Sequence, residues 1–207
     1  LMNRFYYSRF DKTALLTTDE KTYLEGKKNL VVGYLDGFYP FSYEEDGEFK
    51  GLTRDLLESG MHVTGVKFSY RKLADRKEAK ESLRDGKIDV LAYCTDTEEV
   101  LNKYRLKSVC NYAEVPIVLV MEKNRSISDI STLATVSFLQ DKVGEAVQTD
   151  HVTVDIYDTQ QKGMEAVEKG KEDAVLCDGY LAEYLIRTHA GYSHLQIKNV
   201  FSTEHSV

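Results

Sequence analysis

Short apolar runs alternate along the chain with segments whose apolar residues recur every three or four positions. The short runs predict strands, and the segments with the longer period predict helices. We expect strands at 30–34, 66–70, 115–121, 135–139, 152–157 and 195–200, and helices at 17–24, 52–59, 77–84, 128–133, 144–148, 159–169 and 181–188. Strands that alternate with helices are typical of α/β proteins with largely parallel sheets.

One helix-to-strand segment occurs twice, at 83–92 and again at 167–176. In each copy a helical pattern runs into Gly-Lys, then an Asp, then a short apolar run, and Gly86 and Gly170 lie 84 residues apart. We interpret each copy as a helix, a glycine turn and a buried parallel strand. Because Gly-Lys-x-Asp is common after helices, coincidence is the alternative. Two such units with polar groups at their strand ends indicate two lobes facing a ligand cleft.

The connections carry recognisable local signals. Residues 36–43 form an aromatic loop interrupted by a proline, and 45–48 are the tip of a hairpin. Thr17 or Thr18 is expected to be the N-cap of the first helix.

Length and charge restrict the class of protein. A chain of 207 residues that is 42% hydrophobic suffices for one two-lobed domain or two small ones. A formal charge of −7 argues against nucleic-acid binding. No run approaches the roughly 18 apolar residues needed to span a bilayer, and the first residues lack the apolar core of a signal peptide. Any attachment to a membrane would therefore use segments outside this chain.

Catalytic and metal-binding patterns are not found in the sequence. The five histidines, among them His189 and His194, have no metal-like spacing. Neither a glycine-rich phosphate loop nor a Gly-x-Ser-x-Gly elbow occurs. Cys94, Cys110 and Cys177 suit neither zinc nor a redox pair, so we expect buried free thiols. We expect a protein without catalytic residues, metal or cofactor.

Several motifs, taken in order, resemble those of bacterial extracellular solute-binding proteins of the polar-amino-acid class. They are LVVGYLDGFYPFSYEEDGEFKGLTRDLL, LRDGKIDVLAY, NYAEVPIVLVMEKN, TLATVSFLQDK and VEKGKEDAVLCDGYLAEYL. The resemblance covers about residues 30 to 207, and it is the combination of motifs that is specific. The preceding stretch, LTTDEKTYLEGKKNLVVGY, is similar to the linker before such domains in membrane sensor kinases and diguanylate cyclases.

The resemblance implies a two-lobed α/β fold, the type 2 periplasmic-binding-protein or Venus-flytrap fold. Lobe 1 would comprise 29–114 and 199–207, and lobe 2 would comprise 115–198. Residues 1–28 would be a linker and the last helix of a preceding domain. The family's chain returns to lobe 1 with a further strand and helix, so we expect lobe 1 to be incomplete at its C-terminus.

One departure from the family concerns the ligand's carboxylate. The family holds that group with an arginine three residues after a threonine, and the matching stretch here begins at Thr95. Val100 falls in the region where the arginine is expected, and Arg105 lies further on. We therefore expect weak or no binding of ordinary α-amino acids.

The resemblance also implies the ligand-binding residues. Asp178 would hold the ligand's ammonium group, although Asp is also a good N-cap for helix 181–188. Tyr39 and Phe41 would form an aromatic wall, with core packing as the alternative. Lys142 could replace the missing arginine or be an ordinary surface lysine. The full predicted set is Asp36, Tyr39, Phe41, Tyr93, Thr95, Gln140, Lys142 and Asp178.

These expectations lead to one functional hypothesis with two alternatives. The chain would be an extracellular or periplasmic sensor domain of a bacterial membrane receptor that closes around a small polar ligand, an amino acid or an organic acid, and signals across the membrane. It could act as a homodimer or as one of several tandem sensor domains. The first alternative is a receptor that delivers solute to an ABC transporter, and the second is an enzyme on the same scaffold.

Overall fold

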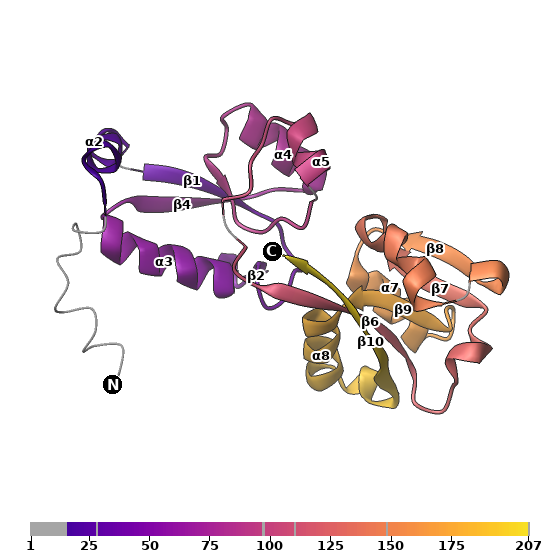
Figure 1. Cartoon of the computed structure of the whole chain (residues 1–207). Coiled ribbons are helices and arrows are strands. Elements are labelled where there is room, and N and C mark those ends of the chain that lie inside the picture. The colour runs from indigo at the N-terminus through magenta and orange to yellow at the C-terminus, as the bar shows by residue number, and fades with distance from the viewer. Residues whose placement is uncertain (1–15, 28, 97, 110, 148, 207) are drawn as a thin grey trace. The chain divides into compact units, whose positions relative to one another are not determined.

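The computed structural model describes residues 16–27, 29–96, 98–109, 111–147 and 149–206 (Figure 1). Side chains at 63, 149 and 199–206 lie outside the described part. The described residues form two compact units. Unit 1 runs to Cys94 and includes Asn102–Leu106, and unit 2 comprises Thr95–Leu101 and the residues from Lys107 onward.

Unit 1 contains a parallel sheet of three strands in the order β4-β1-β5. Its strands are β1 (Asn29–Tyr34), β4 (Lys67–Lys72) and β5 (Val90–Leu91), and its helices are α2 (Thr18–Gly26), α3 (Leu52–Thr64) and α4 (Arg76–Arg84). A hairpin of β2 (Tyr43–Glu45) and β3 (Glu48–Lys50) precedes α3, and α5 (Glu98–Lys103) follows β5. The core includes Val32, Phe49 and Ala92. Because the three sheet strands are parallel, they all end at the same edge of the sheet.

Local sequence signals explain the boundaries of several elements in unit 1. Thr17 is the N-cap of α2 and forms a capping box with Glu20, as predicted. Asp46 and Gly47 at the hairpin tip both have positive φ, as a two-residue hairpin turn requires. Gly65 ends α3 in the left-handed conformation. The predicted helix at 52–59 is therefore real but extends five residues further, to Thr64.

Unit 2 contains a five-stranded mixed sheet in the order β10-β6-β9-β7-β8. The strands are β6 (Glu114–Glu122), β7 (Thr132–Val136), β8 (Thr153–Tyr157), β9 (Ala174–Asp178) and β10 (Leu195–Ser206). Strands β7, β8 and β9 are parallel, whereas β6 is antiparallel to both β9 and β10. The helices are α6 (Val143–Ala146), α7 (Gln160–Glu168) and α8 (Gly179–Thr188), and the 3-10 turns are Ile127–Asp129, Ser137–Lys142, Thr149–His151 and Ala190–His194.

The core of unit 2 lies under its central strands. Leu119, Met121, Leu133 and Leu176 are fully buried and belong to one cluster. On the other side of the sheet α7 approaches closely, because a Cβ on Gly163 would lie 2.9 Å from the Val175 Cγ2. The central strands are thus covered by packed side chains along their length.

The two copies of the repeated segment adopt the same backbone geometry. Gly86 and Gly170 have φ values of 69° and 66°. The N–H of Lys87 donates to the Ser82 carbonyl oxygen at 2.8 Å, and the N–H of Lys171 donates to the Ala166 carbonyl oxygen at 2.9 Å. The strands that follow belong to two separate sheets. The predicted pair of similar helix–turn–strand units is confirmed, but only β9 is a buried strand as predicted, because both residues of β5 are half-buried.

The aspartate of each copy holds the start of a neighbouring strand. An Asp89 carboxylate oxygen accepts the Val31 N–H at 2.9 Å, and Lys27 pairs with the same carboxylate. Asp173 accepts the N–H groups of Ser131 and Thr132 at 2.8 and 3.1 Å, and it pairs with Arg125.

We call Asp89 and Asp173 the strand clasps. Both clasps lie at the edge where the parallel strands of their sheet begin.

Two predicted elements were wrong in position. Residues 128–133 do not form a helix, because only Ile127–Asp129 turn and β7 begins at Thr132. The strand predicted at 135–139 ends at Val136, and a 3-10 turn follows. The physical reason is the clasp at Asp173, which draws Ser131 and Thr132 into the sheet from a distant part of the chain.

The division into units by contact differs from the predicted lobe boundaries, and the predicted thiols are found in part. Strand β10 pairs with β6 along 195–206, so residues 107–114 and 199–206 group with unit 2 by contact. Their assignment to lobe 1 stays a prediction. Cys177 is a buried thiol outside any disulfide, as expected. Cys94 is also outside any disulfide but is half-buried rather than buried, and Cys110 lies outside the described residues.

Candidate functional site

All eight predicted ligand residues lie at or just after the carboxyl end of a parallel strand. Asp36, Tyr39 and Phe41 follow β1, Tyr93 and Thr95 follow β5, Gln140 and Lys142 follow β7, and Asp178 is the last residue of β9. This is the edge at which α/β sheets bind ligands. The placement agrees with the predicted site, whereas the ligand role of each residue stays a prediction.

The aromatic residues of unit 1 are largely part of its core. Phe41 and Tyr93 are each 2% exposed, and their ring centroids lie 5.7 Å apart. Phe38 contacts the same Tyr93 ring at 4.8 Å. Tyr39 is half-buried and stacks on Tyr43 at 4.3 Å. Phe38, Tyr39 and Tyr43 are half-buried, so part of each ring is accessible, whereas Phe41 and Tyr93 are not.

Charged side chains form a closed network where β1 and β4 end. The Lys72 ammonium contacts Asp36 Oδ2 at 2.9 Å and Glu44 Oε1 at 3.0 Å. The Tyr34 hydroxyl donates to Glu44 Oε2 at 2.8 Å, and the Glu44 N–H donates to Asp36 Oδ1 at 2.9 Å. Each carboxylate oxygen of Asp36 and Glu44 therefore already accepts a hydrogen bond.

The network shifts the pKa of its members in the directions expected for ion pairs. Partial burial opposes ionisation of Asp36, but the hydrogen bonds from Lys72 and the Glu44 N–H hold its pKa below the usual range. Burial and the adjacent Glu44 carboxylate raise the pKa of Tyr34 to about 12. At neutral pH the network consists of two carboxylates, one ammonium and a neutral phenol.

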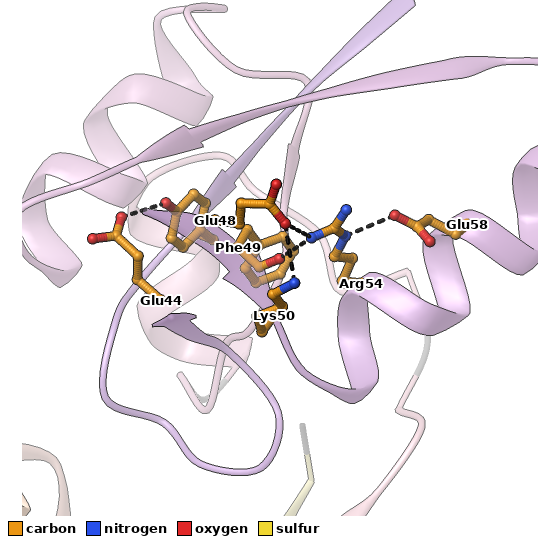
Figure 2. Close-up of polar contacts among 7 residues, drawn as sticks. Glu44, Glu48, Phe49, Lys50, Arg54 and Glu58 are labelled. Atoms are coloured by element: carbon orange, nitrogen blue, oxygen red, sulfur yellow. Dashed lines mark hydrogen bonds and ion pairs between the residues drawn. The ribbon is translucent and has the colours of Figure 1, made fainter. Parts of the chain in front are cut away.

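An arginine of α3 anchors the hairpin that carries Glu44 (Figure 2). The Arg54 Nε donates to Glu58 Oε1 at 2.7 Å, and its Nη1 donates to the Phe49 carbonyl oxygen. The same Nη1 lies 3.4 Å from Glu48 Oε2. The guanidinium also lies over the Tyr70 ring, 5.6 Å from its centroid. These contacts fix the hairpin and hence the carboxylate of Glu44.

In unit 2 the carboxylate of Asp178 is buried at the junction of β9 and α8. The residue is 2% exposed, and its Oδ1 accepts the N–H groups of Tyr180 and Leu181 at 2.8 and 3.2 Å. Its own N–H donates to Gln160 Oε1 at 2.6 Å. Asp178 is therefore the N-cap of α8, which is the alternative left open by the sequence. An N-cap role and a ligand role are compatible.

Burial opposes the ionisation of Asp178. Desolvation raises its pKa from the ordinary 3.8 to about 6, although the two N–H groups act in the other direction. None of the described Lys, Arg or His side chains forms an ion pair with it. A buried carboxylate without a cation among the described residues is a strong candidate for a ligand contact.

The residues after β7 and on or near α5 give weaker support to a role in ligand binding. Lys142 pairs with Glu145 at 3.2 Å, and Gln140 is exposed on the 3-10 turn. Val100 is half-buried on α5, and Arg105 is exposed just beyond it. Neither Lys142 nor Arg105 is shown to take the place of the missing arginine.

Three polar residues at these strand ends were missed by the sequence analysis. They are Lys72, Glu44 and Gln160, which contact Asp36 or Asp178. Lys72 is the last residue of β4 and could have been found as a cation at a strand's carboxyl end. Gln160 directly follows the N-cap Thr159 and has no comparable signal.

Other features of the described residues lie away from this edge. A cavity of about 590 Å³ is lined by α2 and by Val66 and Lys67 at the start of β4, so it lies at the opposite end of that strand from Lys72. The described residues contain no cluster of three metal-ligating side chains. Within the same part of the chain, no helix combines the length and apolar character needed to cross a bilayer.

The model for bacterial extracellular solute-binding proteins, family 3, matches residues 30–184. The chain belongs to this family. The match includes every predicted ligand residue, from Asp36 to Asp178. The family is one of extracellular solute-binding proteins and not of enzymes.

Two curated proteins show where family members similar to this chain occur. The virulence sensor protein BvgS of Bordetella bronchiseptica is 26% identical over 182 residues, which are 85% of this chain and 14% of BvgS. The probable amino-acid-binding protein YxeM of Bacillus subtilis is 23% identical over 152 residues, 70% of this chain and 57% of YxeM. The chain thus spans a small part of the sensor protein and little more than half of the binding protein.

Solved structures confirm the type 2 periplasmic-binding-protein fold. The periplasmic VFT2 domain of Bordetella pertussis BvgS matches with a TM-score of 0.76 at 19% identity, over 92% of this chain and 83% of that domain. The arginine-bound form of truncated ArgBP from T. maritima matches with a TM-score of 0.68 at 22% identity, over 90% of this chain and 89% of ArgBP. The predicted fold class is therefore confirmed.

Proposed function

We propose that this chain is the ligand-sensing module of a bacterial membrane receptor and that it recognises a small molecule with a cationic group. Asp178 would contact that group through a charge-assisted hydrogen bond. Ligand binding would shift the equilibrium between two conformations of the module, and segments outside this chain would carry the change across the membrane. The module would act on the periplasmic or extracellular side, as the BvgS domain does.

The observation that carries the ligand assignment is the buried carboxylate of Asp178, which forms no ion pair with a cation among the described residues. Ser, Thr or Asn would cap α8 about as well without placing a charge in the interior. Keeping an aspartate there opposes folding at neutral pH, because its pKa is raised to about 6. Groups that destabilise the free protein in this way are typical of functional sites.

The likeness to a sensor protein supports the receptor assignment. BvgS is named as a virulence sensor, and its similarity covers 85% of this chain. The similarity to YxeM, named as a probable amino-acid-binding protein, keeps a receptor of an ABC transporter as the second candidate function.

A ligand screen tests the proposal. The thermal stability of the protein would be measured with amino acids, amines and organic acids, and every hit repeated with Asp178→Asn. A ligand at 100 times its Kd should stabilise the protein by about 2.7 kcal/mol. We expect hits with cationic groups that Asp178→Asn weakens at least tenfold. Hits of anionic molecules alone, unaffected by the substitution, would refute the assignment.

Cells can separate the two candidate functions. Deletion of the module from the natural protein should abolish the cell's signalling response to the ligand while leaving uptake of the labelled ligand intact. Loss of uptake would instead establish the transport function.

A further inference from the structure

The cavity beside α2 lies within unit 1, at the opposite end of β4 from the predicted ligand residues (Figure 1). Residues between 16 and 27 form one wall, and residues 64–67, at the end of α3 and the start of β4, form the other. Its volume of about 590 Å³ is in the range of small-molecule sites. None of the eight predicted ligand residues lines it.

The helix α2 turns an unusual face toward this cavity. A helix that packs on a domain normally buries an apolar stripe, whereas α2 has no buried residue. Its half-buried residues are Lys21 and Leu24, which both line the cavity, and every other residue of α2 is exposed. The contact of α2 with the rest of unit 1 therefore leaves a space that neighbouring side chains of the described residues do not fill.

Positive charge exceeds negative charge around the cavity. Three lysines and Glu25 line it, which gives a formal charge of +2 in a chain whose net charge is −7. Of the three lysines, Lys27 is paired with Asp89. Lys21 and Lys67 form no ion pair with any residue in the described part of the chain. These two ammonium groups are therefore available to an anion.

Apolar side chains complete the lining. Val66 is buried, and Leu16 and Leu24 are half-buried. A wholly apolar occupant would cover the two ammonium groups without giving them a partner, which is unfavourable. A cationic occupant would meet like charge. The lining thus matches a molecule that combines an apolar body with a negatively charged group.

We propose that this cavity is a second binding site, which takes a small organic anion with an apolar body and one carboxylate or sulfonate group. Lys21 and Lys67 bind the charged group through charge-assisted hydrogen bonds, and Leu24 contacts the apolar body. Because Lys21 belongs to α2 and Lys67 to β4, the anion links the helix to the sheet. This site goes beyond the proposed function and does not depend on the role of Asp178.

A matched pair of fluorescent probes tests the site on the unaltered protein. Anilinonaphthalene sulfonate has an apolar aromatic body and one negative charge, and phenylnaphthylamine is the same body without the sulfonate. Both fluoresce when they leave water, so fluorescence titration gives a Kd for each. The sulfonate is expected to bind and the effect of each substitution is then compared between the two probes.

Substitution of the two lysines should affect the charged probe alone. The double variant Lys21→Met and Lys67→Met should weaken binding of the sulfonate at least tenfold and change the Kd of the neutral probe less than twofold, because methionine keeps an apolar stem and removes the charge. The matched control is Lys77→Met with Lys107→Met, which removes two exposed lysines that do not line the cavity. That control should change neither Kd by more than twofold.

Hydrogen exchange then locates the bound sulfonate. Its binding should slow the exchange of amides at 18–26 in the unaltered protein and in the control variant, and it should fail to do so in the double variant at Lys21 and Lys67. Circular dichroism of each variant would verify that it is folded.

Three results would overturn the proposal. Unchanged affinity of the double variant for the sulfonate would show that the two lysines do not bind the anion. An equal loss for both probes would show that the lysines act through shape, and that the cavity accepts a neutral apolar group, such as a side chain of another polypeptide. Protection from exchange elsewhere in the chain, without protection at 18–26, would show that the anion binds at another place.

Discussion

The buried carboxylate of Asp178 predicts how the stability of unit 2 depends on pH. Asp178→Asn removes the ionisable group and keeps an N-cap side chain for α8. The asparagine is close in shape and charge to the protonated aspartic acid. Wild type and variant should therefore be equally stable at a pH where Asp178 is protonated, and they should differ where it is ionised.

The size of the difference follows from the raised pKa. Burial moves the pKa of Asp178 from 3.8 to about 6, and each pKa unit corresponds to about 1.4 kcal/mol, so ionisation lowers the free energy of unfolding by about 3 kcal/mol. Because the folded-state pKa is raised, its stabilising contribution is complete below pH 3.8 and is lost as the pH rises through 6. At pH 7.5 the variant should be more stable than wild type by about 3 kcal/mol.

Urea unfolding of both proteins, followed by circular dichroism from pH 4 to pH 8, provides the measurement. The difference in the free energy of unfolding should be near zero at pH 4 and grow through pH 5 and 6 to its plateau. Asp75→Asn is the matched control, because it makes the same substitution at the exposed N-cap of α4. That control should not gain stability at pH 7.5.

Two results would refute this reasoning. Parallel stability curves for wild type and Asp178→Asn would show that the carboxylate is not desolvated in the free protein. A variant that is less stable at pH 7.5 would show that the charged cap contributes more than burial opposes.

Four further outcomes are expected. Binding of a cationic ligand near pH 6 should release a proton from Asp178, because the ligand favours the ionised carboxylate. Calorimetry in buffers of different ionisation enthalpy would detect this proton release, and identical heats of binding in all buffers would contradict it. Gln160→Ala should destabilise the protein by about 1–3 kcal/mol, because the buried Asp178 N–H loses its acceptor; an unchanged urea midpoint would contradict this. Asp173→Asn should lower the free energy of unfolding by about 1–3 kcal/mol, and Asp89→Asn is the equivalent change in unit 1. Because the pKa of each aspartate is lowered, the stability that it contributes is lost as the pH falls. A larger loss of stability in Asp173→Asn at pH 4 than at pH 7 would contradict this. Glu172 is buried, and desolvation is the chief cause of its raised pKa. The stability that it contributes in its protonated form is therefore lost as the pH rises through this raised pKa. Glu172→Gln should make the free energy of unfolding fall less steeply toward neutral pH, and an unaltered slope would contradict this.

Local signals in the sequence were sufficient for most elements of the fold. The capping threonine Thr17, the Asp46-Gly47 hairpin tip and the glycines of the two repeated segments each specify a backbone conformation through their own chemistry. The start of β7 could not be predicted in this way, because it depends on an Asp173 side chain 42 residues away from Ser131.

Contacts between residues far apart in the sequence likewise limited the prediction of the candidate site. The carboxyl ends of the strands are visible in the sequence, and Asp178 could be predicted from its place after an apolar run. Its partner Gln160 lies 18 residues earlier, and Lys72 lies 36 residues from Asp36. Such pairs depend on how the strands are ordered in the sheet, which periodicity alone does not reveal.

The strand clasps have a consequence for how this domain could change over evolution. They secure the amino ends of the strands through Asp89 and Asp173, whereas the predicted ligand residues stand at the carboxyl ends. Phe41 and Tyr93 belong to the core, but substitutions at the exposed or half-buried members of the second set leave both the clasps and the core untouched, so a new ligand preference can be acquired without loss of the framework. A change of specificity should therefore be engineered at exposed or half-buried positions such as Asp36, Tyr39 and Gln140, while Asp89 and Asp173 are kept.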